Sequence, residues 1–169
     1  MFTFGAVIAV SVYGFTDDTV IPFGIAANVA AAGGAIFAGR LDDRLGPRRV
    51  IVGSLILMLG AGLVLLFVDG MVGFWIFGLV LCLFVGPAQS ASRTYLVRLT
   101  PPGKEGQRFG LYAMTGRAAS FLAPTLFGLF AFIFGDDRWG IIGIMLVLVA
   151  GLLALMRVPA LQGDRARSE

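Results

Sequence analysis

The feature that most constrains this chain is a series of long apolar runs separated by short charged segments. A helix needs about 20 mostly apolar residues to cross the roughly 30 Å of hydrocarbon in a bilayer. Five runs meet or approach that length, at residues 20–39, 50–68, 71–92, 109–134 and 140–156. A further apolar run, residues 2–15, is too short to cross by itself. The pattern predicts an all-α, polytopic membrane helix bundle with five full spans and a partial first one.

Composition supports a bundle that faces lipid. Hydrophobic residues make up 58% of the 169 residues and charged residues only 14%, whereas soluble domains carry roughly 25% charged residues. The 24 glycines are about twice the usual share, and small residues let membrane helices approach closely. A soluble domain of this size would need more charge to face water.

The same counts argue against several function classes. The chain has no histidine, and its one cysteine, Cys82, lies inside an apolar run, so we expect neither a disulfide framework nor a thiolate metal cluster. The basic residues lie in clusters between apolar runs rather than on one polar face, which argues against a nucleic-acid partner. No acid lies within a span and no nucleophile is paired with a base. We therefore expect no enzyme activity, no cofactor and no metal site.

The loops between the spans differ sharply in charge. One set of loops, together with the residues from 157 onward, holds 11 basic residues: Arg40, Arg44, Arg48, Arg49, Arg93, Arg98, Lys104, Arg108, Arg157, Arg165 and Arg167. The opposite loops hold only Arg138. Because Lys and Arg concentrate in the cytoplasmic loops of membrane proteins, we expect the charged tail, residues 158–169, in the cytoplasm. A bacterial-type inner membrane is the expected location.

Small residues recur at every fourth position along three predicted spans. The three sets are Ala27, Ala31, Ala35 and Gly39; Gly78, Cys82, Gly86 and Ser90; and Gly116, Ser120, Pro124 and Gly128. Such spacing places each set on one stripe of its helix and favours close helix packing. A lining role along a substrate path is the alternative.

The most specific motif bridges two spans on the basic side. Its informative residues are Gly39, Asp43, Arg44, Gly46, Arg48 and Arg49. A glycine is expected where the helix ends and turns, and an acid is placed to meet a helix N-terminus or a neighbouring arginine. A basic loop that merely obeys the positive-inside rule is the simpler reading, but that rule does not require the two glycines and the acid at these offsets.

Arg117 is the one charged residue deep inside a predicted span. It lies about nine residues in, or roughly 13 Å at 1.5 Å per residue. A charge at that depth costs at least ~2.5 kcal/mol, so we expect it to face the bundle interior or a wet cavity. An anionic substrate group, an acid outside this chain or backbone carbonyls near Pro124 could neutralise it. A structural contact or snorkelling toward the cytoplasm is the alternative.

The other polar candidates are uncharged, except for one residue at a span end. Asn28, Gln89, Tyr112 and Ser120 are candidate substrate contacts, and Arg93 is expected at the cytoplasmic end of its helix, sharing a face with Gln89. Each of the uncharged groups alone is more often an interhelical hydrogen bond than a ligand.

The motif residues resemble a known family. The pattern Gly39-x-Leu41-x-Asp43-Arg44-x-Gly46-x-Arg48-Arg49 resembles the signature loop of the major facilitator superfamily. Two downstream stretches resemble its vacuole-effluxer-like branch, which is related to autophagy-linked permeases described as amino acid exporters. They are Gln89-Ser90-x-Ser92-Arg93, continued by Leu99-Thr100-Pro101-Pro102-Gly103-Lys104-Glu105, and Phe109-Gly110-Leu111-Tyr112-x-x-x-Gly116-Arg117-x-x-Ser120-Phe121-Leu122-x-Pro124.

This resemblance carries several expectations. A family member has about twelve helices in two halves, and this chain matches helices seven to twelve, with the seventh truncated. It implies part of a secondary transporter that moves a small solute, such as an amino acid or another anionic or zwitterionic metabolite, by alternating access. Its expected partners are the lipid bilayer, the solute, and the N-terminal half or a second copy. The alternative is a half-size membrane protein that acts in structure or assembly without transport of its own.

Overall fold

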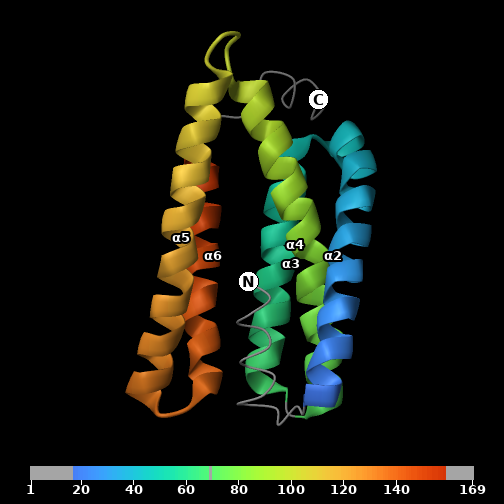
Figure 1. The fold of residues 1–169 in the computed structure, drawn as a ribbon, viewed down its shortest axis with the longest axis vertical. Helices are drawn as coiled ribbons and strands as arrows, with labels where there is room; N and C mark the ends of the chain where they lie inside the picture. The colour runs from blue at the N-terminus through green and yellow to red at the C-terminus, as the bar shows by residue number, and fades with distance from the viewer. Residues whose placement is uncertain (1–16, 69, 159–169) are drawn as a thin grey trace.

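In the computed structural model, residues 17–68 and 70–158 are described, and they form helices without any strand. The elements are α2 (Asp17–Leu45), α3 (Pro47–Phe67), α4 (Met71–Leu99), α5 (Glu105–Phe134), the short 3-10 helix η1 (Asp137–Trp139) and α6 (Gly140–Arg157) (Figure 1). The five α-helices are each long and apolar enough to cross a membrane. The prediction of an all-α membrane bundle with five full spans is therefore confirmed. The partial span at residues 2–15 lies outside the described residues, as does the tail beyond Val158.

The helices continue past the points where charge ends the apolar runs. α2 extends through the charged segment to Leu45, and α4 extends to Leu99. Charge limits the part of a helix that lies in hydrocarbon, but it does not unwind the helix. α2 stops where Gly46 takes a φ of 85°, and α4 stops at Thr100, which precedes Pro101 and therefore disfavours the helical conformation.

Because the helices are longer than the apolar runs, Arg93 and Gly39 lie at positions other than those predicted. Arg93 lies within α4, more than a turn before its end, and not at the helix terminus as predicted. Gly39 lies within α2 and is exposed, so the glycine that ends the helix is Gly46.

The helices pack in two groups (Figure 1). α4 lies against both α2 and α3, α5 lies against α6, and α6 also contacts α3. Near the α3–α4 connection, a core cluster that includes Phe23, Phe74, Phe127 and Ile141 draws on all five helices. At the opposite end a second cluster around Ile51 and its neighbours draws on α2, α3, α4 and α6 but contains no residue of α5. The first half of α5 therefore stands apart from the core.

The α2–α4 contact is the closest in the bundle, because glycines let the two backbones meet. A Cβ added at Gly34 would overlap the carbonyl oxygen of Leu83, and one added at Gly86 would overlap that of Ala31. Gly78 packs against the ring of Phe23. Gly78 and Gly86 of the second predicted set thus pack closely, and Gly86 does so against Ala31 of the first set, whereas Gly34 belongs to neither set.

The buried face of α2 nevertheless departs from the predicted stripe. It follows Phe23, Ala27, Gly34, Ala38 and Asp42 and leaves Gly39 exposed. At 3.6 residues per turn, each step of four residues rotates the stripe by about 40°. A long strict i, i+4 series therefore drifts off the contact face.

The third set of small residues does not make the α5–α6 contact. Gly116 and Gly128 have open space around them within the described structure. The close approach is instead at the start of α6, where Gly143 meets the backbone of Leu126 and Gly140 meets the ring of Phe127.

Candidate functional site

The signature loop is compact because α3 begins directly after a single glycine. Gly46 donates its N–H to the carbonyl oxygen of Asp42 at 3.0 Å and accepts from Val50 at 3.3 Å. Its φ of 85° is a conformation that a side chain would strain. Pro47 then fixes the first turn of α3, where a missing N–H has no cost.

The two adjacent acids of the loop differ in burial. Asp42 is buried, with 7% of its surface exposed, whereas Asp43 is exposed. The N-cap of α3 is Gly46, without a side-chain hydrogen bond, so Asp43 does not cap this helix. A pairing of Asp43 with another part of a full transporter stays a prediction. The sequence signal for Asp42 is its position two i+4 steps beyond Gly34 on the buried face of α2.

Two arginines of the basic end are fixed by backbone carbonyls. Arg48 Nη2 donates to the carbonyl oxygen of Met156 at 3.3 Å and so ties the start of α3 to the end of α6. Arg108 Nη1 donates to the carbonyl oxygen of Leu99 at 3.0 Å and ties the start of α5 to the end of α4. Arg49 and Arg44 are exposed on the same end of the molecule.

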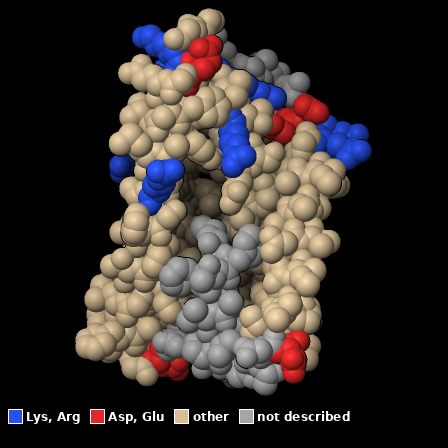
Figure 2. Space-filling model, in the orientation of Figure 1, with Lys and Arg blue, Asp and Glu red and all other residues tan. Residues whose placement is uncertain are grey.

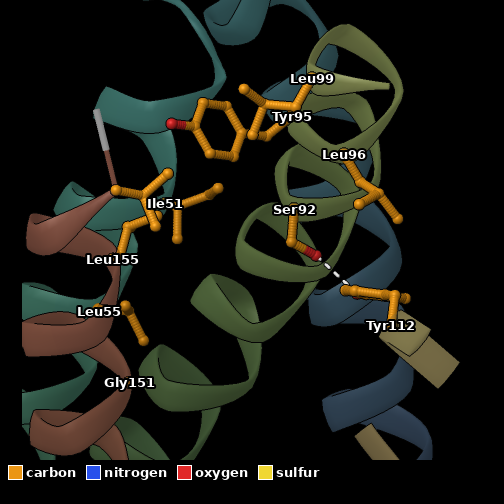
Figure 3. Close-up of a pocket in the computed structure, with 10 residues that line it drawn as sticks. Ile51, Leu55, Ser92, Tyr95, Leu96, Leu99, Tyr112, Gly151 and Leu155 are labelled. Atoms are coloured by element: carbon orange, nitrogen blue, oxygen red, sulfur yellow. Dashed lines mark hydrogen bonds between the residues drawn. The ribbon is translucent and has the colours of Figure 1, made fainter. Parts of the chain in front are cut away.

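One pair of the polar candidates comes together between α4 and α5. The hydroxyls of Ser92 and Tyr112 lie 2.8 Å apart, and Ser92 Oγ also donates to the carbonyl oxygen of Gln89 at 2.8 Å (Figure 3). Because a serine hydroxyl has a single proton, Tyr112 is the donor in the bond between the helices. Ser92 was recognised in the sequence only as a neighbour of the candidates, yet it is the α4 partner in this link.

Two further candidates hydrogen bond within their own helices. Asn28 Nδ2 donates to the carbonyl oxygen of Gly24 at 2.8 Å, and Ser120 Oγ donates to that of Gly116 at 2.8 Å. Both side chains are exposed. The described structure shows no hydrogen bond that joins either of them to Tyr112 or Gln89.

Arg117 lies at the middle of the apolar stretch of α5 and is exposed. Among residues 17–68 and 70–158 its guanidinium makes no hydrogen bond or ion pair. Every residue from Pro101 to Leu122 is exposed, and in the described structure this stretch bonds to α4 through Arg108 and Tyr112. The expectation that Arg117 faces an interior cavity stays a prediction.

The described pocket lies beside the Ser92–Tyr112 bond, between α4 on one side and α3 and α6 on the other, toward the basic ends of these helices (Figure 3). Its volume is about 320 Å³, and its lining is almost wholly apolar. The lining residues are Ile51, Leu55, Ser92, Tyr95, Leu96, Leu99, Tyr112, Gly151, Leu155 and Val158. The sequence does not predict this pocket, because most of its walls are ordinary apolar residues, drawn from four helices.

The described residues bring together no group of three His, Cys, Asp or Glu side chains that could hold a metal ion. Lys and Arg gather toward the end that holds the α4–α5 loop, whereas the acidic residues visible at the opposite end carry no basic neighbours on that face (Figure 2).

Comparison with known proteins adds a family match over nearly the whole chain. The family model described as "Vacuole effluxer Atg22 like" matches residues 3–168. Autophagy-related protein 22 of Cryptococcus neoformans var. neoformans serotype D (strain B-3501A) is 31% identical over 189 residues, which cover 99% of this chain and 34% of that protein. The uncharacterized MFS-type transporter YxiO of Bacillus subtilis (strain 168) is 25% identical over 131 residues, 78% of this chain and 31% of that transporter.

The chain thus spans about a third of the length of these relatives. No solved structure matches it significantly.

Proposed function

The chain belongs to the Atg22-like vacuole effluxer family, and from that premise we propose that it forms the C-terminal half of a secondary transporter. The transporter would move a small anionic or zwitterionic solute, such as an amino acid, by alternating access. The names of the family and of the Bacillus relative are those of transporters, which is consistent with a role outside catalysis.

One observation carries the proposal: a bundle of five spanning helices whose family match covers about a third of each relative. A rocking transporter needs two bundles around a site near the membrane midplane. The exposed first half of α5, from Glu105 to Leu122, supplies a surface on which such a second bundle could close. The N-terminal half of a twelve-helix protein, or a second copy of this chain, is the proposed partner.

Arg117 is the proposed solute contact. It stands on the exposed stretch of α5, deep in an apolar helix, and no described acid neutralises it. A guanidinium offers a planar fork of donors that suits a carboxylate. The four uncharged candidates would act as hydrogen-bonding groups: Asn28, Gln89, Tyr112 and Ser120.

We further propose that the basic end of the bundle faces the cytoplasm. The loops around Gly46 and Gly103 and the last turn of α6 meet at that end (Figure 1), and they carry nearly all of the arginines. The positive-inside rule supports this orientation, and it supports an inner membrane of bacterial type. The signature loop, including Asp43 and Arg44, would then lie where the two halves meet on the cytoplasmic side.

The alternative is a half-size membrane protein that assembles with other chains but does not transport. No acid lies within the apolar runs 20–39, 50–68, 71–92, 109–134 and 140–156. Any proton coupling would therefore need groups outside these runs, which favours this alternative.

Uptake by proteoliposomes separates the two. We would compare this chain alone with a twelve-helix version in which it is joined to the remaining portion of a full-length family relative. Radiolabelled glutamate, leucine and lysine are tested separately. Transport by the twelve-helix version alone is the expected result. Transport by this chain alone would contradict the half-transporter, and no transport by either would favour the assembly role.

A further inference from the structure

The pocket at the basic end is unsuited to a hydrophilic solute. Its walls are aliphatic and aromatic, and its volume of about 320 Å³ lies at the lower end of the roughly 300–1,000 Å³ typical of ligand pockets. The hydroxyls of Ser92 and Tyr112 bond to each other. Ser92 also donates its one proton to Gln89. What this cavity can accept is a hydrocarbon.

Two arginines bind backbone carbonyls of the α4 and α6 segments that line the pocket. Arg108 is bound to the carbonyl of Leu99, which lines the pocket. Arg48 is bound to the carbonyl of Met156, which lies between the lining residues Leu155 and Val158. Each guanidinium has five N–H donors, and one is used in each of these contacts. The remaining donors are available to an anion.

Among the described residues, the nearby Glu105 forms no ion pair with either arginine. Glu105 accepts a hydrogen bond at 3.1 Å from the N–H of Gly103, within the α4–α5 loop. Residues 1–16 include no acid, so they could not neutralise the two arginines. An occupant must therefore carry a hydrocarbon part and an anionic part together.

We propose that this pocket binds an anionic phospholipid, with one acyl chain in the cavity and the phosphate between Arg48 and Arg108. Apolar space beneath a cationic rim at the end of membrane helices is the arrangement by which proteins hold acidic lipid head groups, and arginine matches phosphate with two parallel hydrogen bonds. The lipid would join α3 and α6 to α4 and α5 at the end where the core contains no residue of α5.

Native mass spectrometry of the purified chain tests the site, using phosphatidylglycerol and phosphatidylcholine of equal chain length. The expected result is preferential retention of one phosphatidylglycerol. In the double variant Arg48→Gln/Arg108→Gln that retention falls at least tenfold, while the weaker retention of phosphatidylcholine is unchanged. Arg98→Gln replaces an exposed arginine in the last turn of α4 that does not line the pocket; it is the matched control and binds as the parent chain does.

Two further experiments distinguish the contribution of the acyl chain to binding from that of the phosphate. Gly151→Leu places a side chain in the pocket and is expected to reduce retention of both lipids. Glycerol 3-phosphate, the head group without acyl chains, is expected not to displace the bound lipid. Equal retention of the two lipids by the parent chain would overturn the proposal. So would retention at the level of the parent chain in the double variant or in Gly151→Leu. A loss of retention in Arg98→Gln as large as that in the double variant would also overturn it. A pocket filled by residues 1–16 or by a second copy would give low retention in every variant. Because the readout is binding, its outcome is independent of whether the chain transports.

Discussion

Gly33 and Gly34 follow one another in α2, yet their surroundings are opposite. Gly33 is exposed and has open space around it, whereas Gly34 is buried against the backbone of α4 at Leu83. The contact between α2 and α4 therefore depends on the missing side chain at one glycine and not at its neighbour.

Gly34→Ala should accordingly destabilise the bundle by about 1–3 kcal/mol, the usual range for overpacking a tight contact. Gly33→Ala is the matched control, and it should be neutral or stabilising by up to about 1 kcal/mol, because alanine favours helix over glycine. Thermal stability of the purified chain in detergent measures both. Equal stability of the two variants would show that α2 and α4 are not packed as described.

A second prediction at this scale concerns Arg117 in the twelve-helix version. Arg117→Ala should reduce solute uptake to background while membrane insertion stays normal, because removal of the charge lowers the cost of burying that segment. Arg117→Lys should keep part of the activity with weaker solute binding, since lysine offers only a point charge. Arg98→Ala, on the exposed last turn of α4, is the control. Normal uptake by Arg117→Ala would assign Arg117 a structural role.

At the scale of whole elements, α5 differs from its neighbours because its two halves have different surroundings. Phe127 anchors the second half in the core, whereas the first half is exposed. The first half is tied to α4 by the hydrogen bond of Arg108 to Leu99 and by the one between Tyr112 and Ser92. A single hydrogen bond contributes about 0.5–1.5 kcal/mol. That is enough to bias the separation of two helix ends but not to lock it.

Tyr112→Phe should therefore broaden and lengthen the distance distribution between spin labels at Val97 and Met114, two exposed positions on α4 and α5. Thr115→Val is the matched control: it also removes a hydroxyl from α5, but that hydroxyl bonds to Leu111 in the same helix. An unchanged distribution in Tyr112→Phe would mean that this bond does not set the spacing of the two helices.

Sequence patterns predicted the elements better than their contacts. Span length and hydropathy suffice to locate a membrane helix, because every backbone group must be satisfied within it. They do not fix where the helix ends, and so Arg93 was expected at a terminus that lies at Leu99 instead. Nor do they fix which face of a helix is buried, because the hydropathy of an almost uniformly apolar helix changes little around its axis. The sequence therefore singled out Asp43, which is exposed, and not Asp42, which is buried.

The candidate site was predicted in its chemistry but not in its assembly. Tyr112, Gln89 and Arg117 are polar residues in apolar helices, and such residues are rare enough to be identified from the sequence as candidates. Which of them meet depends on the crossing of α4 and α5, and that crossing leaves Tyr112 beside Ser92 and Arg117 on an open surface. The apolar pocket carries no unusual residue type, so only the structure reveals it.

At the scale of the whole molecule, the arrangement of charge predicts an orientation. The α2–α3 and α4–α5 connections and the end of α6 lie together at one end, and the α3–α4 and α5–α6 connections lie at the other (Figure 1). Arginines concentrate at the first end, whereas acids are found at both ends. Moving several arginines across the hydrocarbon would be costly, so a single orientation should dominate.

Cysteine labelling checks this orientation. In a background with Cys82→Ala, Met71→Cys and Asp136→Cys should react with a membrane-impermeant maleimide from outside intact cells. Lys104→Cys should react only in inverted vesicles. All three positions are exposed, and Met71 is a better site than Gly70, whose φ of 96° would strain a cysteine. Reaction at all three sites from the same side would refute the helical crossings themselves. Reaction at Met71 and Asp136 only in inverted vesicles, with Lys104 reactive from outside, would keep the crossings but reverse the orientation, and the arginines of the signature loop would then face the exterior.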